Sequence, residues 1–323
     1  VGRIQYLHLG PMTFSEFLQE LEPDLHHTLD TIDLKPDKLH TTDLQKVIPD
    51  TLHKRLMARQ RQYLFTGGMP EAVLAFSETG SMEESSQIHR DIINTYQDDF
   101  AKYARQTDLM LLQRVFRTIP SQVGNKVKYS NFSTENRALK VKSMIDLLEK
   151  ARVCYRVNAC SCDGLPLNAS INEKVFKLIF MDVGLMNHVN GLRWRDINGM
   201  NDTRLVNEGA LAEQFIGQHL AFMNQGLESP QLTYWLREHR SGNAEVDYVM
   251  VMDGNIVPVE VKAGRSGKLR SLHQFALTRG AKLALRFDAN PPGVQDVTAT
   301  VQHKGESQDV KYRLVSLPLY AVG

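Results

Sequence analysis

Residues 244–262, AEVDYVMVMDGNIVPVEVK, predict two β-strands joined by a tight hairpin turn at 253–255. Successive side chains of a strand point to opposite faces, so Glu260 and Lys262 should lie on the same face of the second strand. Pairing across the turn brings the first strand beside the second. Asp247 is therefore expected to approach Glu260 from the neighbouring strand.

The elements around this hairpin follow the order αβββαβ. Apolar residues at helical spacing predict a helix over residues 211–220, and an apolar run predicts a strand over 232–236. A second helix is expected to start near Lys268, and alternating apolar residues predict a further strand over 283–287. Residues 201–323 are therefore expected to form a unit in which helices pack against a central sheet.

The predicted sheet brings chemically active groups together. Two carboxylates, Asp247 and Glu260, beside the ammonium group of Lys262 would form the oxygen-rich site that Mg²⁺ or Mn²⁺ prefers. Glu213, in the preceding helix, would supply a third carboxylate. The lysine would orient or help deprotonate an attacking water, or offset charge on a phosphate. The alternative is a purely structural ion pair at the end of a buried strand, where an unpaired charge would be costly.

Residues 108–200 predict a winged helix-turn-helix unit, because helices are followed there by a two-stranded hairpin. Its recognition helix would cover residues 137–150 and offer Arg137, Lys140 and Lys142 to DNA phosphates. The alternative is a packing or protein-contact module, since three basic residues on a solvated helix face are common.

Residues 1–107 predict a mainly helical segment. A capping box at 13–16 starts one helix, a second helix covers about 52–65, and a third carries apolar residues every four positions from 88 to 100. The polar stretch 22–40, which contains two prolines, is expected to be a loop or insertion.

Composition narrows the class of protein. A chain of 323 residues exceeds the usual single-domain size, so two or three packed units are expected. The net charge of +1 excludes a globally basic nucleic-acid coat, although it leaves local patches open. No stretch of eighteen apolar residues occurs and the first residues do not resemble a secretory signal, so we expect neither a transmembrane helix nor a signal peptide. Three cysteines suit reduced thiols in a cytoplasmic protein.

The order of elements and residues in the last unit resembles the PD-(D/E)xK restriction-endonuclease-like fold, whose members mostly cut DNA phosphodiesters. The resemblance implies that Glu213 is the helix carboxylate, that Asp247 and Glu260 are metal ligands, and that Lys262 is the catalytic lysine. It implies a polar site residue at Gln274. The fold class expected for the whole chain is thus α/β in several α+β domains: a helical segment, a winged helix and a nuclease-like domain.

Short motifs extend the resemblance over the whole chain. They are similar, in the same order, to those of a large group of prokaryotic AAA-type P-loop ATPases that end in a restriction-endonuclease-like domain of unknown function. The matching stretches are Gly2–Leu18, Gly67-Gly68-Met69-Pro70, Phe180-x-Asp182-x-Gly184-Leu185 and Glu208-Gly209-Ala210-x-x-Glu213-x-Phe215-Ile216.

The phosphate-binding loop of those ATPases does not occur in this sequence. Gly264-Arg265-Ser266-Gly267-Lys268 has the wrong spacing for a Walker motif and is followed by leucine. We therefore expect ATP binding and hydrolysis only with an N-terminal nucleotide core that this chain lacks. Arg3 resembles an arginine near the end of that core.

The sequence leaves two functions open. The first is a C-terminal part of an AAA-type ATPase whose nuclease-fold domain binds or processes nucleic acid, as a Mg²⁺-dependent DNA endonuclease if the site is active. The second is a non-catalytic nuclease-fold scaffold for protein partners or regulation. DNA, a protein partner and further copies of the chain are the partners considered, and no membrane.

Overall fold

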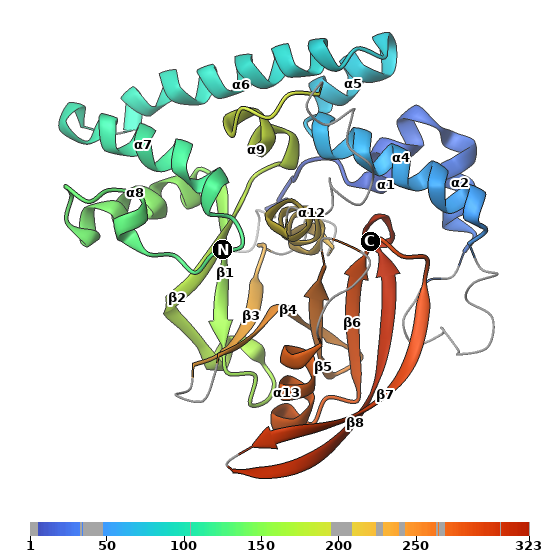
Figure 1. Cartoon of the computed structure of the whole chain (residues 1–323). Coiled ribbons are helices and arrows are strands. Elements are labelled where there is room, and N and C mark those ends of the chain that lie inside the picture. Colours follow the sequence, from blue (N-terminus) through green and yellow to red (C-terminus); the bar gives the residue numbers. More distant parts are fainter. Residues whose placement is uncertain are drawn as a thin grey trace.

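The computed structural model of the chain describes residues 6–32, 34, 48–103, 105–194, 209–223, 229–238, 243–262, 264, 269–303 and 305–322. Over these residues the protein has a mixed α/β fold built on one sheet of eight strands. Helices gather at one end of the sheet, and α13 lies against one of its faces (Figure 1). The predicted α/β class is confirmed. Arg3 lies outside the described residues.

The helices precede most of the strands along the chain. The α-helices are α1 (Phe14–Leu21), α2 (Pro23–Asp30), α4 (Asp50–Thr66), α5 (Pro70–Thr79), α6 (Met82–Tyr103), α7 (Gln106–Gln122), α8 (Ala138–Lys150), α9 (Val183–Val189), α12 (Gly209–Phe222) and α13 (Arg270–Arg279). Short 3₁₀ turns are η1 (Tyr129–Asn131), η2 (Leu167–Ser170) and η3 (Leu319–Ala321).

The eight strands run in the order β2-β1-β3-β4-β5-β6-β8-β7 across the sheet. Their bounds are β1 (Cys154–Cys160), β2 (Ile171–Phe180), β3 (Leu232–Arg237), β4 (Ala244–Met252), β5 (Asn255–Val261), β6 (Leu283–Asp288), β7 (Gly293–His303) and β8 (Glu306–Pro318). The β4–β5 hairpin has the predicted antiparallel register, with Tyr248 opposite Val259. The long β7–β8 hairpin was not predicted from the sequence.

One prediction in the N-terminal segment is wrong. Residues 22–40 were expected to be a loop, but Pro23–Asp30 form α2. Pro23 stands at the first helical position, where its missing N–H costs nothing, and Leu25 buries the inner face of the helix. The proline therefore starts a helix here.

The predicted winged-helix elements are present, but their hairpin does not stand apart. β1 and β2 pair with each other, and β1 also pairs in parallel with β3, with Val157 opposite Leu232. The hairpin thus extends the sheet of the C-terminal unit. The sheet continues across the proposed boundary between residues 108–200 and 201–323.

Two apolar clusters cover the two faces of the sheet. The larger joins α12 with the N-terminal helices and includes Phe215 and Val259. The smaller lies under α13, where Phe275 packs edge-on against Trp235 with ring centroids 5.3 Å apart. The strands β4 and β5, which carry Asp247 and Glu260, therefore lie between two packed layers.

The structure also bears on membrane spanning and on the state of the cysteines. No helix among the described residues has both the length and the apolar character needed to cross a membrane. All three cysteines are buried and carry free thiols.

Candidate functional site

Asp247 lies where β4 and β5 stop pairing as a regular ladder. The last ladder pair is Tyr248 with Val259, and beyond it the Asp247 Oδ2 atom accepts a hydrogen bond of 2.7 Å from the backbone N–H of Val261. The register between β3 and β4 shifts between Val246 and Val249, so a β-bulge surrounds Asp247. Bulges re-aim a side chain, and this one turns a carboxylate into the space between two strands.

Glu260, on β5, forms an ion pair with Lys262, which directly follows the strand. The two side chains lie on the same face, as strand alternation predicted. The Lys262 Nζ atom contacts Glu260 Oε1, while the other carboxylate oxygen, Oε2, is buried and makes no hydrogen bond to any described residue. The Lys262 side chain is 26% exposed, compared with 6% for Glu260. The pair is therefore reachable from solvent through the lysine.

Glu213 reaches the same region from α12, but its closest partner is a residue that the sequence did not single out. The Nζ atom of Lys177 on β2 lies 3.3 Å from Glu213 Oε2 and 3.9 Å from Asp247 Oδ1, and it also contacts Glu245. A lysine inside the apolar run 175–181, VFKLIFM, was the available signal, because a charge there needs partners.

The Lys177 group and the Glu260–Lys262 pair also interact electrostatically with each other, so that four carboxyl groups and two ammonium groups form one site. Burial, with a further contribution from Asp247, raises the pKa of Glu213 to about 8 and that of Glu260 to about 7. Burial also raises the pKa of Asp247, against the opposing effect of Lys177. The excess of negative charge makes the ionised site unfavourable unless another cation joins it.

Both lysines of the site remain charged. Burial alone would lower the pKa of Lys262, but the adjacent Glu260 outweighs it and the net pKa lies above the usual value. The same balance, with Glu213, Asp247 and Glu245, raises the pKa of Lys177. Lys262 is thus placed to donate a hydrogen bond or offset charge, and its expected part in deprotonating a water stays a prediction.

The fit to a metal ion is partial. The described part of the chain contains no group of three or more His, Cys, Asp or Glu side chains placed to hold one metal ion. Glu213 faces Lys177, and Glu260 faces Lys262 with one oxygen. The unpartnered Glu260 Oε2 and the neighbouring Asp247 are the donors that suit a hard divalent cation.

A groove of about 620 Å³ opens beside the acidic cluster. One wall is the turn after α7, with Lys126 and Lys128, and the other is formed by the ends of β3 and β4, with Glu245. The turn also lies over Glu213, since a Cβ atom on Gly124 would stand 3.3 Å from the carboxylate oxygens. The groove therefore runs along the edge of the site.

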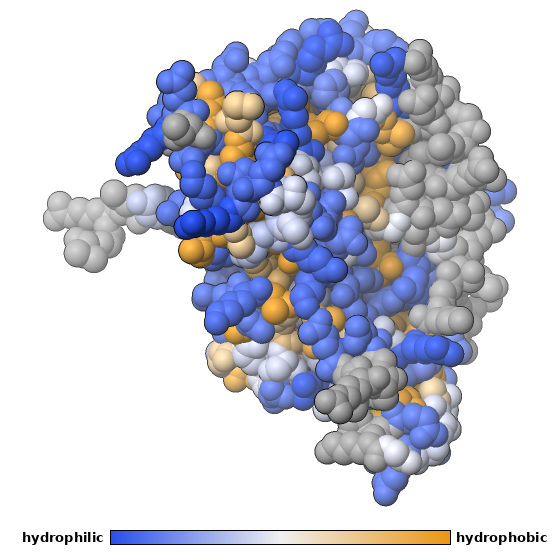
Figure 2. All heavy atoms as spheres, turned by 60° about the vertical axis from the view of Figure 1, so that its left-hand side comes forward, coloured by the Kyte–Doolittle hydropathy of each residue, from blue (hydrophilic) through white to orange (hydrophobic). Residues whose placement is uncertain are grey.

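The predicted recognition helix α8 offers less free charge than expected. Lys140 contacts Asp108 at 3.0 Å and Lys142 contacts Asp146 at 2.9 Å, whereas Arg137 is exposed at the N-cap. The face that comes forward in Figure 2 is largely hydrophilic, with apolar residues scattered among polar ones. DNA contact by these three residues stays a prediction.

Gln274, expected as a polar site residue, lies on α13. Its side-chain Nε2 atom is buried and makes no hydrogen bond within the described structure. Among the described residues no hydrogen bond joins this nitrogen to the carboxylates, so a role in the site stays a prediction.

The remaining sequence motifs meet in a second buried junction, which surrounds Asp182 and contains neither Asp247 nor Glu260. The backbone N–H of Gly68 donates to Asp182 Oδ2 at 2.7 Å, and that of Met12 donates to the carbonyl of Gly68 at 2.7 Å. Gly67 has φ +68°, and a Cβ there would lie 2.2 Å from Asp182 Oδ1. These motif residues are therefore explained by packing.

The junction also holds the helix that carries Glu213. The backbone N–H of Phe14 donates to His219 Nε2 at 2.8 Å, and Gln218 Nε2 donates to the Tyr63 hydroxyl at 2.9 Å. The N-terminal segment is thereby tied to α12.

Comparison with protein families gives two matches that divide the chain. Residues 208–319 match the model of the domain of unknown function DUF4143. This DUF4143 region contains Glu213, Asp247, Glu260 and Lys262, whereas Lys177 lies in residues 57–196, which match a second domain of unknown function, DUF8612. No curated protein and no solved structure matches the chain.

Proposed function

We propose that this chain is the C-terminal region of an AAA-type P-loop ATPase, and that its DUF4143 region binds nucleic acid and cleaves it with Mg²⁺ or Mn²⁺. Two findings support the ATPase context: the motif resemblance along the chain, and the DUF4143 match, since that domain is common in AAA ATPase-associated proteins. The observation that carries the cleavage proposal is the meeting of Glu213, Glu260 and Lys262 around Asp247.

The electrostatics of the site favour a bound cation. Four carboxyl groups face two ammonium groups, and the raised pKa values of Glu213 and Glu260 show that their ionised forms are poorly compensated. A divalent ion held by Asp247 and Glu260 would remove this penalty. When bound, Mg²⁺ would supply Lewis-acid stabilisation to a phosphate.

The protein side chains have separate roles in this proposal. Lys262, charged and partly exposed, donates hydrogen bonds to a phosphate oxygen or to the attacking water. Lys177 fixes Glu213 relative to Asp247. Lys126 and Lys128 line the adjacent groove and offer cationic contacts to the strand backbone.

Cleavage of plasmid and single-stranded DNA in Mn²⁺ tests the proposal. Asp247→Ala and Lys262→Ala should each reduce the rate at least about 100-fold, because one removes a metal ligand and the other a transition-state contact. Lys311→Ala, an exposed substitution on β8, is the control and should cleave like the unmodified chain. Circular dichroism verifies folding, and cleavage that persists in both site variants would reject this site.

A non-catalytic scaffold is the second candidate, and one observation favours it. Each lysine of the site is held in an ion pair, and the described residues form no metal-binding group of three. Such a cluster can simply fix the β4–β5 hairpin. Calorimetric titration with Mn²⁺ separates the two candidates, since a scaffold shows no binding that depends on Asp247 and Glu260.

A further inference from the structure

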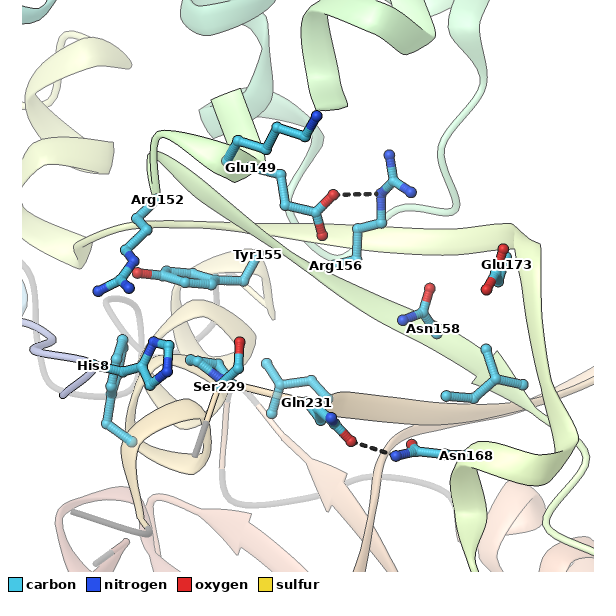
Figure 3. A pocket seen from close by; sticks show the side chains of 15 residues that line it. His8, Glu149, Arg152, Tyr155, Arg156, Asn158, Asn168, Glu173, Ser229 and Gln231 are labelled. Atoms are coloured by element: carbon cyan, nitrogen blue, oxygen red, sulfur yellow. Dashed lines mark hydrogen bonds and ion pairs between the residues drawn. The ribbon is translucent and has the colours of Figure 1, made fainter. Parts of the chain in front are cut away.

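A second cavity, of about 560 Å³ (Figure 3), lies at the start of β3, whereas the groove described above lies at the end of that strand. It is formed by the end of α8, the β1–β2 hairpin, the start of β3 and His8. A volume of this size suits a small molecule rather than a single ion. None of the motifs discussed above accounts for it.

One end of the cavity is cationic. Arg152 and His8 line this end, and Arg152 makes no ion pair with a described residue, while Lys150 is a further lining residue of the cavity. In Figure 3 the guanidinium of Arg152 lies beside the hydroxyl of Tyr155, with His8 next to them. Burial raises the pKa of Tyr155 to about 12, so its hydroxyl stays a neutral hydrogen-bond donor.

Arg152 occupies a position that usually belongs to glycine. Its N–H donates to the carbonyl of Glu149 and that of Val153 donates to the carbonyl of Leu148, which is the Schellman pattern at the end of α8. The residue at this point has φ +59°, in the left-handed region that disfavours side chains. An arginine held in that conformation, with its side chain lining a cavity, points to a function for the side chain.

The other end of the cavity is rich in amides. Asn158, Asn168 and Gln231 line it, and Asn168 Nδ2 donates to Gln231 Oε1. Glu173 lies at the same end in Figure 3, so this end disfavours an anion. The neighbouring Arg156 is held by Asp146 and Glu149 and adds no free charge.

We propose that this cavity binds a nucleoside phosphate, with the phosphate at Arg152 and His8 and the base at Asn158 and Gln231. The guanidinium of Arg152 and the imidazole of His8 offer hydrogen-bond donors to the phosphate, and the amides offer the paired donors and acceptors that a base edge requires. The ring of Tyr155, held edge-on against Phe222 at 5.6 Å, provides an aromatic surface between the two ends. The same unit occurs in a free nucleotide and at the end of a nucleic-acid strand.

This site is independent of the proposed cleavage function. It uses no residue of the Asp247 cluster and no Walker-type loop, so a titration in EDTA isolates it. The Asp247→Ala variant should bind the nucleoside phosphate like the unmodified chain. A failure of the cleavage proposal would therefore not affect the binding proposal.

Isothermal titration with AMP, ATP, 5′-phosphorylated dT4 and inorganic phosphate tests the proposal. We expect saturable binding of at least one nucleoside phosphate, and weaker binding of inorganic phosphate. Arg152→Gly should lower affinity about 10-fold or more by removing a charged donor. The same change should raise the melting temperature, because glycine suits the left-handed position.

Further variants make the outcome decisive. Gln231→Ala should weaken nucleotides but not inorganic phosphate, and Lys174→Ala, exposed on β2, should change neither. Binding of dT4 without AMP or ATP would assign the site to strand ends, and the reverse to free nucleotides. No saturable binding, equal affinity for inorganic phosphate, or an affinity unchanged in Arg152→Gly and Gln231→Ala would overturn the proposal.

Discussion

At the scale of single residues, the site depends on Lys177. Its side chain is only 3% exposed and its ammonium group serves Glu213, Glu245 and Asp247 at once. It also lies 5.2 Å from the centre of the Tyr234 ring, which adds a cation–π contact. A buried lysine with these partners holds carboxylates from α12 and β4 in one place.

The pH dependence of stability follows from Glu213. Its pKa in the folded protein, about 8, lies above its ordinary value of 4.5, so the folded state binds the proton more tightly than the unfolded state. The stability that this proton provides is complete below pH 4.5 and is lost as the pH rises toward about 8. Glu213→Gln should remove this loss, worth on the order of 5 kcal/mol, at pH 8.5.

Thermal unfolding in EDTA between pH 5.5 and 8.5 measures this effect. The melting temperature of Glu213→Gln should fall less with pH than that of the unmodified chain, because one of the two carboxyl groups of the site with a strongly raised pKa is then absent. Glu306→Gln, an exposed change on β8, is the control. Parallel curves for Glu213→Gln and the unmodified chain would contradict the assigned environment of Glu213.

The sequence predicted part of this site for a clear reason. Asp247, Glu260 and Lys262 lie within one hairpin, where strand alternation and the 253–255 turn fix their relative positions. Lys177 comes from β2, which is separated from β4 in the sheet by β1 and β3. Its position near Asp247 therefore depends on the order of the strands. Local periodicity carries no information about such long-range neighbours.

At the scale of elements, predictions succeeded where an apolar pattern was long. The helices of residues 1–107 with clear periodicity and the β4–β5 hairpin are confirmed. α2 was missed because a short polar helix depends on its packing, here through Leu25, more than on propensity. The β7–β8 hairpin was missed because Gly305 and its polar neighbours give a weak turn pattern.

The turn after α7 should contribute more to DNA binding than the recognition helix. Lys140 and Lys142 are held by aspartates, whereas Lys128 is exposed and makes no ion pair with a described residue. Lys126 contacts Glu238 at 2.5 Å and lines the same groove. The Lys126→Ala/Lys128→Ala variant should therefore bind DNA more weakly and lower the salt slope by about 1 to 2.

Fluorescence anisotropy with a labelled duplex over a range of salt concentrations measures both quantities. The matched variant is Lys140→Ala/Lys142→Ala, which removes the same charge from α8 and should have a smaller effect. Arg137→Ala reports on the exposed end of that helix. A larger loss in the α8 variants than in the turn variant would return DNA contact to the recognition helix.

At the scale of the whole molecule, one sheet unites regions that match two different domain models. β1 and β2 belong to residues 57–196, and β3 to β8 lie within residues 208–319. The parallel pairing of β1 with β3 and the reach of Lys177 to Asp247 both cross that division. A large apolar cluster crosses it too, with Phe215 of α12 packed among residues of the helical part.

This continuity predicts that the two regions unfold together. A fragment of residues 201–323 would expose the edge of β3, leave Glu213 and Asp247 without Lys177, and uncover the apolar face of α12. The whole chain should therefore unfold in a single calorimetric transition, and the fragment alone should show no cooperative transition. Mixing it with residues 1–200 should restore one, whereas a fragment that unfolds cooperatively by itself would establish two independent units that merely share a sheet edge.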